Sequence, residues 1–169
     1  MEKEGFKPII DKDTEIVILG TMPGDVSIQT GEYYANSKNQ FWKIIFKIFN
    51  NGLGEYSYSN KTELLLKNKI GLWDVLSKAE RAGSLDSNIH GEEFNDFKKL
   101  FTEFPKLRIV VFNGKKAADY FKGFKSIPKD KEYYILPSTS SANTWKTFEQ
   151  KCKEWKGILE NTVANSILW

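Results

Sequence analysis

The fold is decided by residues 16–42, IVILGTMPGDVSIQTGEYYANSKNQFW. A β-branched apolar run ends at Gly20, a turn containing proline and glycine follows, and Asn39 comes just before an aromatic-rich helical pattern. In α/β folds, a buried strand that leads through a loop into a helix is where ligands bind, because backbone N–H groups and side chains converge outside the strand's carboxyl end. The stretch therefore predicts an α/β fold with a site at this loop.

The rest of the chain alternates between short apolar runs and helical patterns. This alternation predicts a parallel sheet with right-handed crossovers and helices on both faces. Residues 1–14 and 77–96 carry no such pattern, so we expect a polar lead-in and a segment that is mostly loop. We predict one domain, residues 1–169, with a three-layer α/β/α sandwich around a four-stranded, mostly parallel sheet. The expected strands are Glu15–Gly20, Gly71–Leu76, Arg108–Gly114 and one in Tyr133–Ser141 that breaks at Pro137 into a small-polar loop. The expected helices are Phe41–Asn50, Thr62–Lys69, one through Phe94, Phe97, Phe101 and Phe104, one after Gly114, and one through Trp145, Phe148, Cys152, Trp155 and Leu159.

Composition limits the class of protein. The 169 residues include 25 Lys+Arg against 22 Asp+Glu, and the formal net charge of +3 permits nucleic-acid binding without arguing for it. The single cysteine, Cys152, excludes an internal disulfide and indicates a reducing compartment. One cysteine and one histidine, His90, are too few for the usual zinc site. No apolar run is long enough to cross a bilayer and the N-terminus is no signal peptide, so we expect a cytoplasmic protein without a membrane or metal partner.

Three of the expected strands end in loops that carry polar groups: GTMPG, FNGKK and LPSTSSAN. The carboxyl ends of parallel strands lie at one edge of a sheet, so these loops should surround a single crevice. The chain has no dinucleotide-binding, Walker or nucleophile-elbow motif, and His90 lies in a segment without pattern. Amides, hydroxyls, rings and backbone groups remain, and these suit the recognition of a flat heterocycle and the positioning of water. We expect no cofactor.

Six segments in order carry a resemblance to a known family: GTMPGDVSIQTGEYYANSKNQFW, GLWDVL, ERAGSLDSNI, NDF, VVFNGKKA and LPSTSSAN. Over nearly the whole chain they resemble the DNA-deoxyinosine (hypoxanthine-DNA) glycosylase family of the uracil-DNA glycosylase superfamily. The resemblance implies a monofunctional enzyme that extrudes a deaminated base from DNA, hydrolyses its N-glycosidic bond and leaves an abasic site. DNA containing deaminated bases is the implied partner, and we expect a monomer.

The resemblance also implies a catalytic residue. Related mismatch-specific uracil enzymes carry a catalytic asparagine inside the first turn, where this chain has Met22, which cannot orient a water molecule. In the deoxyinosine family, the catalytic residue resembles the asparagine of an N-x-F-W segment. The asparagine of that segment in this chain is Asn39. An asparagine at this place is also well suited to cap the helix that follows. The two roles are compatible.

Several residues would hold the base. Tyr34 occupies the place of a base-stacking aromatic in the related enzymes, although Tyr33 or Tyr34 can instead pack beneath the loop. Asn113 matches a position that binds the Watson–Crick edge, where an amide complements hypoxanthine N1–H and O6, although Asn-Gly is also a common turn. The turn that contains Gly20, Met22, Pro23 and Gly24 would supply backbone donors to the departing base.

The serine-rich loop resembles a phosphate-gripping motif, although a cluster that caps a helix would look the same. Related loops often carry a bulky side chain that fills the vacated stack. Serines stand there in this chain, which leaves Asn143 or Trp145 for the role. The expected DNA-binding residues are Lys115, Ser138, Thr139, Ser140, Ser141 and Asn143.

Three other functions fit parts of this pattern. The same fold can excise uracil, or act on G:U and G:T mismatches, although Met22 argues against efficient uracil excision. A relative that binds nucleic acid but has lost the chemistry is a second alternative, and a flavodoxin-type small-molecule domain is a third. No lysine in these loops stands in an obviously desolvated place, so we do not expect Schiff-base lyase chemistry.

Overall fold

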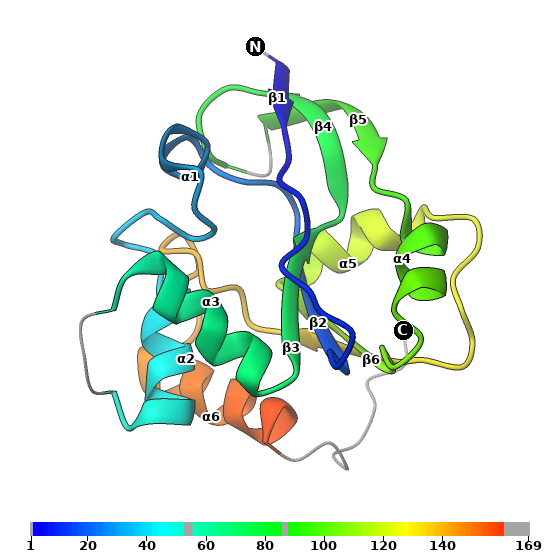
Figure 1. Ribbon diagram of the computed structural model, residues 1–169. Helices are drawn as coiled ribbons and strands as arrows, with labels where there is room; N and C mark the ends of the chain where they lie inside the picture. The colour runs from blue at the N-terminus through cyan, green and yellow to red at the C-terminus, as the bar shows by residue number, and fades with distance from the viewer. Residues whose placement is uncertain (1, 53–55, 86–87, 161–169) are drawn as a thin grey trace.

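The computed structural model describes residues 2–52, 56–85 and 88–160 (Figure 1). A four-stranded sheet with the strand order β3-β2-β6-β7 forms its centre, and all three pairings are parallel. The predicted fold class and its four central strands are confirmed, with bounds that differ from the prediction by a few residues. The strands are β2 (Ile16–Gly20), β3 (Ile70–Asp74), β6 (Ile109–Asn113) and β7 (Glu132–Leu136).

Helices cover both faces of this sheet (Figure 1). Ile16 and Ile18 of β2 face a cluster that includes α2 (Phe41–Asn50), α3 (Tyr58–Lys67) and α6 (Phe148–Leu159). Val17 and Leu19 face a second cluster that includes α4 (Phe97–Glu103) and α5 (Lys115–Lys122). Successive side chains of a strand point to opposite faces, so a strand covered by helices on both sides must be apolar throughout. All five residues of β2 are buried.

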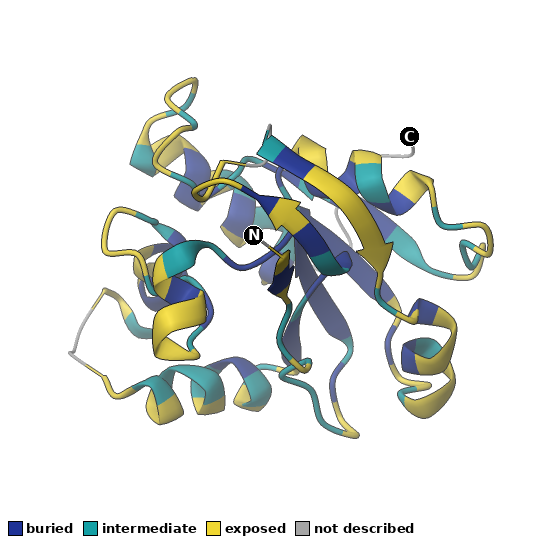
Figure 2. Ribbon diagram, turned by 90° about the horizontal axis from the view of Figure 1, so that it is seen from above, coloured by how far each residue is buried: buried dark blue, intermediate teal, exposed yellow. Residues whose placement is uncertain are grey.

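A second sheet departs from the sequence prediction. β1 (Glu2–Glu4), β4 (Leu76–Arg81) and β5 (Ile89–Phe94) form an antiparallel sheet with the order β1-β4-β5. The interpretation of residues 1–14 and 77–96 as lead-in and loop was therefore wrong for these strands, although residues 86–87 lie outside the described part. In β5 every residue except Ile89 is exposed, as the yellow colouring in Figure 2 illustrates, so the apolar alternation that reveals a strand is missing.

Helix bounds also differ in detail. The short helix α1 (Asp25–Thr30) lies in the loop after β2, where no helix was predicted. Phe94 ends β5 instead of starting α4, whose first turn is capped by the Asp96 carboxylate. Trp145 precedes α6, because Thr147 and Gln150 form a capping box that starts this helix at Phe148. None of the helices in the described ranges is long and apolar enough to cross a membrane.

Candidate active site

A pocket of about 420 Å³ opens at the carboxyl ends of the central strands. Its volume lies within the range of small-molecule sites. The loops that follow three parallel strands meet here, as the topology of a parallel sheet requires, and Ser84 and Leu85 from the antiparallel part of the chain also line the pocket. Apart from Lys115, every residue proposed for the site lines this pocket: Gly20, Met22, Pro23, Gly24, Tyr34, Asn39, Asn113, Ser138, Thr139, Ser140, Ser141 and Asn143.

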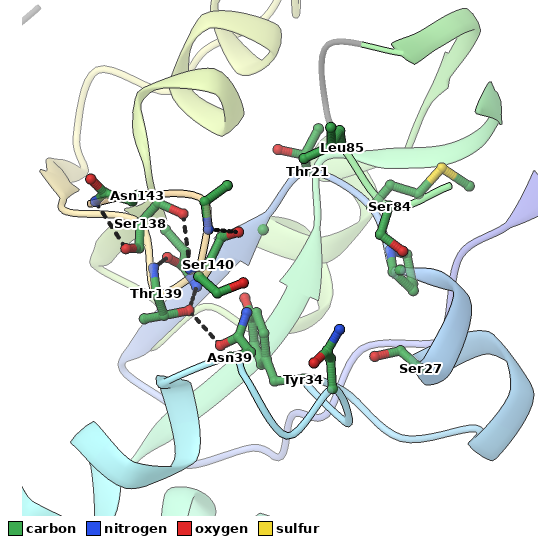
Figure 3. A pocket seen from close by; sticks show the side chains of 18 of the residues that line it. Thr21, Ser27, Tyr34, Asn39, Ser84, Leu85, Ser138, Thr139, Ser140 and Asn143 are labelled. Atoms are coloured by element: carbon green, nitrogen blue, oxygen red, sulfur yellow. Dashed lines mark hydrogen bonds between the residues drawn. The ribbon is translucent and has the colours of Figure 1, made fainter. Parts of the chain in front are cut away.

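The side chain of Asn39 is held by its oxygen (Figure 3). The Oδ1 atom accepts a hydrogen bond of 2.9 Å from the backbone N–H of Phe41 in the first turn of α2. It accepts a second one of 2.8 Å from the Thr139 hydroxyl. Because a backbone N–H can only donate, the amide cannot be turned around without losing this bond. Both lone pairs of the oxygen are engaged, so Asn39 presents its Nδ2 donor to the pocket.

Thr139 connects the two asparagines of the site. Its hydroxyl accepts a hydrogen bond of 2.9 Å from Asn113 Nδ2 while it donates to Asn39 Oδ1. Its backbone N–H donates to Asn113 Oδ1 at 2.9 Å, and its carbonyl oxygen accepts from Gln40 N at 2.9 Å. The Thr139 side chain has no exposed surface. It therefore has no surface with which to contact a phosphate, and we assign it instead to the positioning of both amides.

Two adjacent tyrosines lie beside Asn39 in different environments. Tyr33 is 4% exposed, its hydroxyl donates to the Lys7 carbonyl, and burial raises its pKa. Tyr34 lines the pocket and stacks on Phe41 at 4.1 Å between ring centroids. One face of the Tyr34 ring is thus covered by Phe41, and the stacking of a base on its other face stays a prediction. The backbone of Tyr34 has a φ of 55°, an uncommon conformation for this residue type that turns the chain here.

Asp74 brings a carboxyl group to the pocket that the sequence interpretation did not single out. It ends β3 beside Gly20 of β2, is only 4% exposed and lines the pocket. A Cβ atom on Gly20 would lie 2.6 Å from Asp74 Oδ1 and 3.0 Å from the Tyr34 hydroxyl. This position accepts only glycine unless those groups move. An acidic residue at the end of a buried parallel strand was the available signal.

The second sheet holds the turn that lines one side of the pocket. The buried Arg81 guanidinium of β4 donates to the carbonyl oxygens of Met22 and Pro23. Lys3 of β1, also buried, donates to the Asp25 carboxylate and to the Gly83 carbonyl. Because the guanidinium binds the turn through its carbonyl groups, it fixes the orientation of the peptide planes that line the pocket.

The serine-rich loop is held by its own side chains. Ser138 Oγ accepts from Ser140 N, Ser140 Oγ accepts from Ala142 N, and Asn143 Nδ2 donates to the Ser138 carbonyl. Lys115, in contrast, lies outside the pocket with its side chain 81% exposed, and it pairs with Asp119 one helical turn away. Contacts of these residues with phosphate stay predictions. Within the described ranges, no cluster of His, Cys, Asp or Glu side chains is suited to hold a metal ion.

Comparisons with known proteins agree on one family. The model of the uracil DNA glycosylase superfamily matches residues 8–161. A hypoxanthine DNA glycosylase of Methanosarcina barkeri is 43% identical over 85% of this chain and 89% of its own. A second one, of Methanosarcina acetivorans, is 38% identical over 95% of this chain and 100% of its own. The solution NMR structure of a candidate uracil DNA glycosylase from Methanosarcina acetivorans superposes with a TM-score of 0.81 at 40% identity, covering 94% of this chain and 97% of that one.

Proposed function

Because this chain belongs to the uracil DNA glycosylase superfamily, we propose that it is a monofunctional DNA glycosylase that removes hypoxanthine from DNA and leaves an abasic site. Two relatives at 38% and 43% identity are named hypoxanthine DNA glycosylases and align with most of the chain. We further propose that the chain acts as a cytoplasmic monomer, with residues 1–169 forming one domain.

The hydrogen-bond chain through Thr139 carries this proposal. One buried hydroxyl fixes two amides from different segments, Asn39 before α2 and Asn113 at the end of β6, on the same wall of the pocket. Each amide retains bonding capacity beyond these contacts. Preorganised neutral dipoles of this kind can stabilise a developing charge without any reorganisation during the reaction. The arrangement therefore suits hydrolysis without a covalent intermediate.

The base would bind at the carboxyl edge of the central sheet. Asp74 and Asn113 end the strands on either side of β2, and neighbouring strands lie about 5 Å apart, so the two residues begin roughly 10 Å from each other. A purine would lie between them, above Gly20. Asn113 keeps one N–H and one lone pair after its bonds to Thr139, which matches N1–H and O6 of hypoxanthine. The open face of Tyr34 would stack on the base.

Asn39 would position the water molecule that attacks the sugar. Its Nδ2–H would donate to one lone pair of a water molecule and leave the other lone pair directed at C1′. As the glycosidic bond lengthens, positive charge develops on the sugar and negative charge on the base. The Asp74 carboxylate would stabilise the first, and backbone donors of the turn fixed by Arg81 would stabilise the second. The water adds its oxygen to C1′, and its proton leaves with the base.

Excision assays test this function. The purified protein would be incubated with end-labelled duplexes that contain a single hypoxanthine, uracil or xanthine, and alkali would then break the strand at any abasic site. We expect breaks at hypoxanthine and at most slow cleavage at uracil. A shift in duplex mobility without any break would identify a binding protein instead. Preferential cleavage at uracil would favour the uracil-specific alternative.

A further inference from the structure

Lys151 of α6 is a buried lysine that the proposed function does not use. It is 2% exposed, although lysines are almost never fully buried without an ionic partner. Its Nζ atom donates to the Asn143 carbonyl oxygen at 2.9 Å and to Gln40 Oε1 at 3.0 Å. Asn143 lines the pocket, and Gln40 directly follows Asn39. The ammonium group therefore connects two loops of the site through neutral acceptors.

No carboxylate pairs with this ammonium group within the described ranges. Of the two carboxylates in α6, that of Glu149 pairs with Lys47. The other, that of Glu154, pairs with Lys146. Burial lowers the pKa of Lys151, and no neighbouring charge opposes this shift. A buried charge without a counter-ion is costly, and a neutral donor could connect the same loops at a lower cost. The stability of the fold thus gives no reason for the positive charge.

The bond to Lys151 also orients the peptide group that follows Asn143. In a trans peptide the C=O and the N–H point in opposite directions. Because the Asn143 carbonyl points at the buried Nζ atom, the N–H of Thr144 points away from it, and Thr144 is exposed. Among the residues that the structure describes, neither this N–H nor that of the exposed Ser141 has an acceptor. Exposed backbone donors of this kind bind anions.

We propose that Lys151 supplies, from inside the protein, the positive charge with which residues 138–144 bind a phosphate of DNA. The inference rests on the proposed function, because the phosphate would belong to the strand whose nucleotide enters the pocket. Lys151 has almost no surface with which to touch the phosphate, so it is a positioning residue. It acts through the Asn143 peptide and through its charge, which attracts an anion more strongly across buried protein than across water. The phosphate would be its counter-ion.

Three variants separate the charge of Lys151 from its other contributions. Lys151→Met removes the charge and both hydrogen bonds while keeping an unbranched side chain of similar length. Lys151→Gln is also neutral but retains N–H groups that can donate to the loops. The matched control is Lys153→Met, which removes the same charge from the same helix. Lys153 is exposed, and residues two apart on a helix do not face the same way.

The salt dependence of DNA affinity measures this charge. Each protein would be titrated against a duplex with a single abasic-site analogue between about 50 and about 200 mM salt. Neutralising one phosphate contributes about 0.9 to the slope of log K against log salt. We therefore expect both Lys151 variants to have a slope shallower than that of wild type by about 0.9. They should bind about tenfold more weakly at the lowest salt concentration and about threefold more weakly at the highest. Lys153→Met should keep the slope of wild type.

A role confined to packing would give a different result. Loosened loops would weaken binding by the same factor at every salt concentration, so parallel lines for wild type and Lys151→Met would overturn the proposal. A Lys151→Gln protein with the wild-type slope would also overturn it, because the hydrogen bonds would then suffice without the charge. Melting curves check that each variant is folded, and Lys151→Gln decides alone if Lys151→Met is not.

Release of hypoxanthine by wild type is scored separately from these affinities. If wild type bound the duplex but released no base, the proposed function would fall. The difference in slope between wild type and the Lys151 variants would still decide the role of the buried charge.

Discussion

Replacing Thr139 by valine removes a single hydroxyl from the centre of the site and preserves its shape. The backbone bonds of Thr139 to Asn113 Oδ1 and from Gln40 N remain, so the loop stays attached to its neighbours. Two bonds are lost, the one donated to Asn39 Oδ1 at 2.8 Å and the one accepted from Asn113 Nδ2 at 2.9 Å. The substitution thus isolates the coupling between the two amides.

The expected magnitudes follow from these two bonds. A buried hydrogen bond contributes about 1 kcal/mol net, so Thr139→Val should lower the free energy of unfolding by about 2 kcal/mol. In a chain of this size that corresponds to a melting temperature lower by about 4–8 °C. The effect on excision should be larger, because each amide regains rotational freedom where small errors in position cost about 100-fold in rate. Thr139→Ser keeps the hydroxyl and is the control.

Single-turnover excision of hypoxanthine and thermal unfolding measure the two effects side by side. We expect Thr139→Val to remain folded at the assay temperature and to lose about 100-fold in rate, while Thr139→Ser stays within about tenfold of wild type. A folded Thr139→Val enzyme that works at the wild-type rate would refute the reasoning, because the amides would then need no shared hydroxyl.

Three further predictions concern charged groups around the pocket. Asp74→Asn replaces the carboxyl group by an amide with little change in shape. If the carboxylate stabilises the charge on the sugar as proposed, kcat should fall about 100-fold with a much smaller change in KM, and a kcat near that of wild type would show that it does not act on the sugar. Arg81→Lys keeps the positive charge but loses the planar guanidinium that binds the Met22 and Pro23 carbonyl oxygens. The melting temperature should therefore fall by about 4–8 °C. An unchanged melting temperature would show that the second sheet does not hold the turn. Burial lowers the pKa of Lys151 from 10.5, so the unfolded chain binds more protons between the two values and stability rises with pH there. Urea unfolding should therefore show wild type gaining stability relative to Lys151→Met as the pH rises towards 10.5, and a difference that does not change with pH would contradict this.

The sequence predicts the central sheet because its strands are apolar on both faces and alternate with helical patterns. Ile16–Gly20 is buried throughout, so local composition alone identifies it. The loops that follow parallel strands must share an edge, and that rule brings Asn39, Asn113 and Ser138 to one pocket without any knowledge of side-chain contacts.

The second sheet could not be predicted in the same way. Its strands carry charged residues on the exposed side, and β1 pairs with β4 far along the chain, with Lys3 opposite Ala79. Buried cations such as Lys3 and Arg81 look like surface residues until their partners are known. The role of Thr139 was missed for a related reason, because a threonine in a serine-rich loop carries no sign of burial. Contacts between distant segments decide all three cases.

The proposed mechanism depends most on Asn39 as the group that positions the attacking water, and the single-turnover rate of Asn39→Ala tests this role most directly. The variant loses the two hydrogen bonds that Asn39 Oδ1 accepts, from Phe41 N and from the Thr139 hydroxyl, so it should lose about 2 kcal/mol of stability and melt about 4–8 °C below wild type while staying folded. We predict that excision of hypoxanthine from a duplex falls by at least about 100-fold, with duplex binding retained. A folded Asn39→Ala protein that releases hypoxanthine at the wild-type rate would contradict the account.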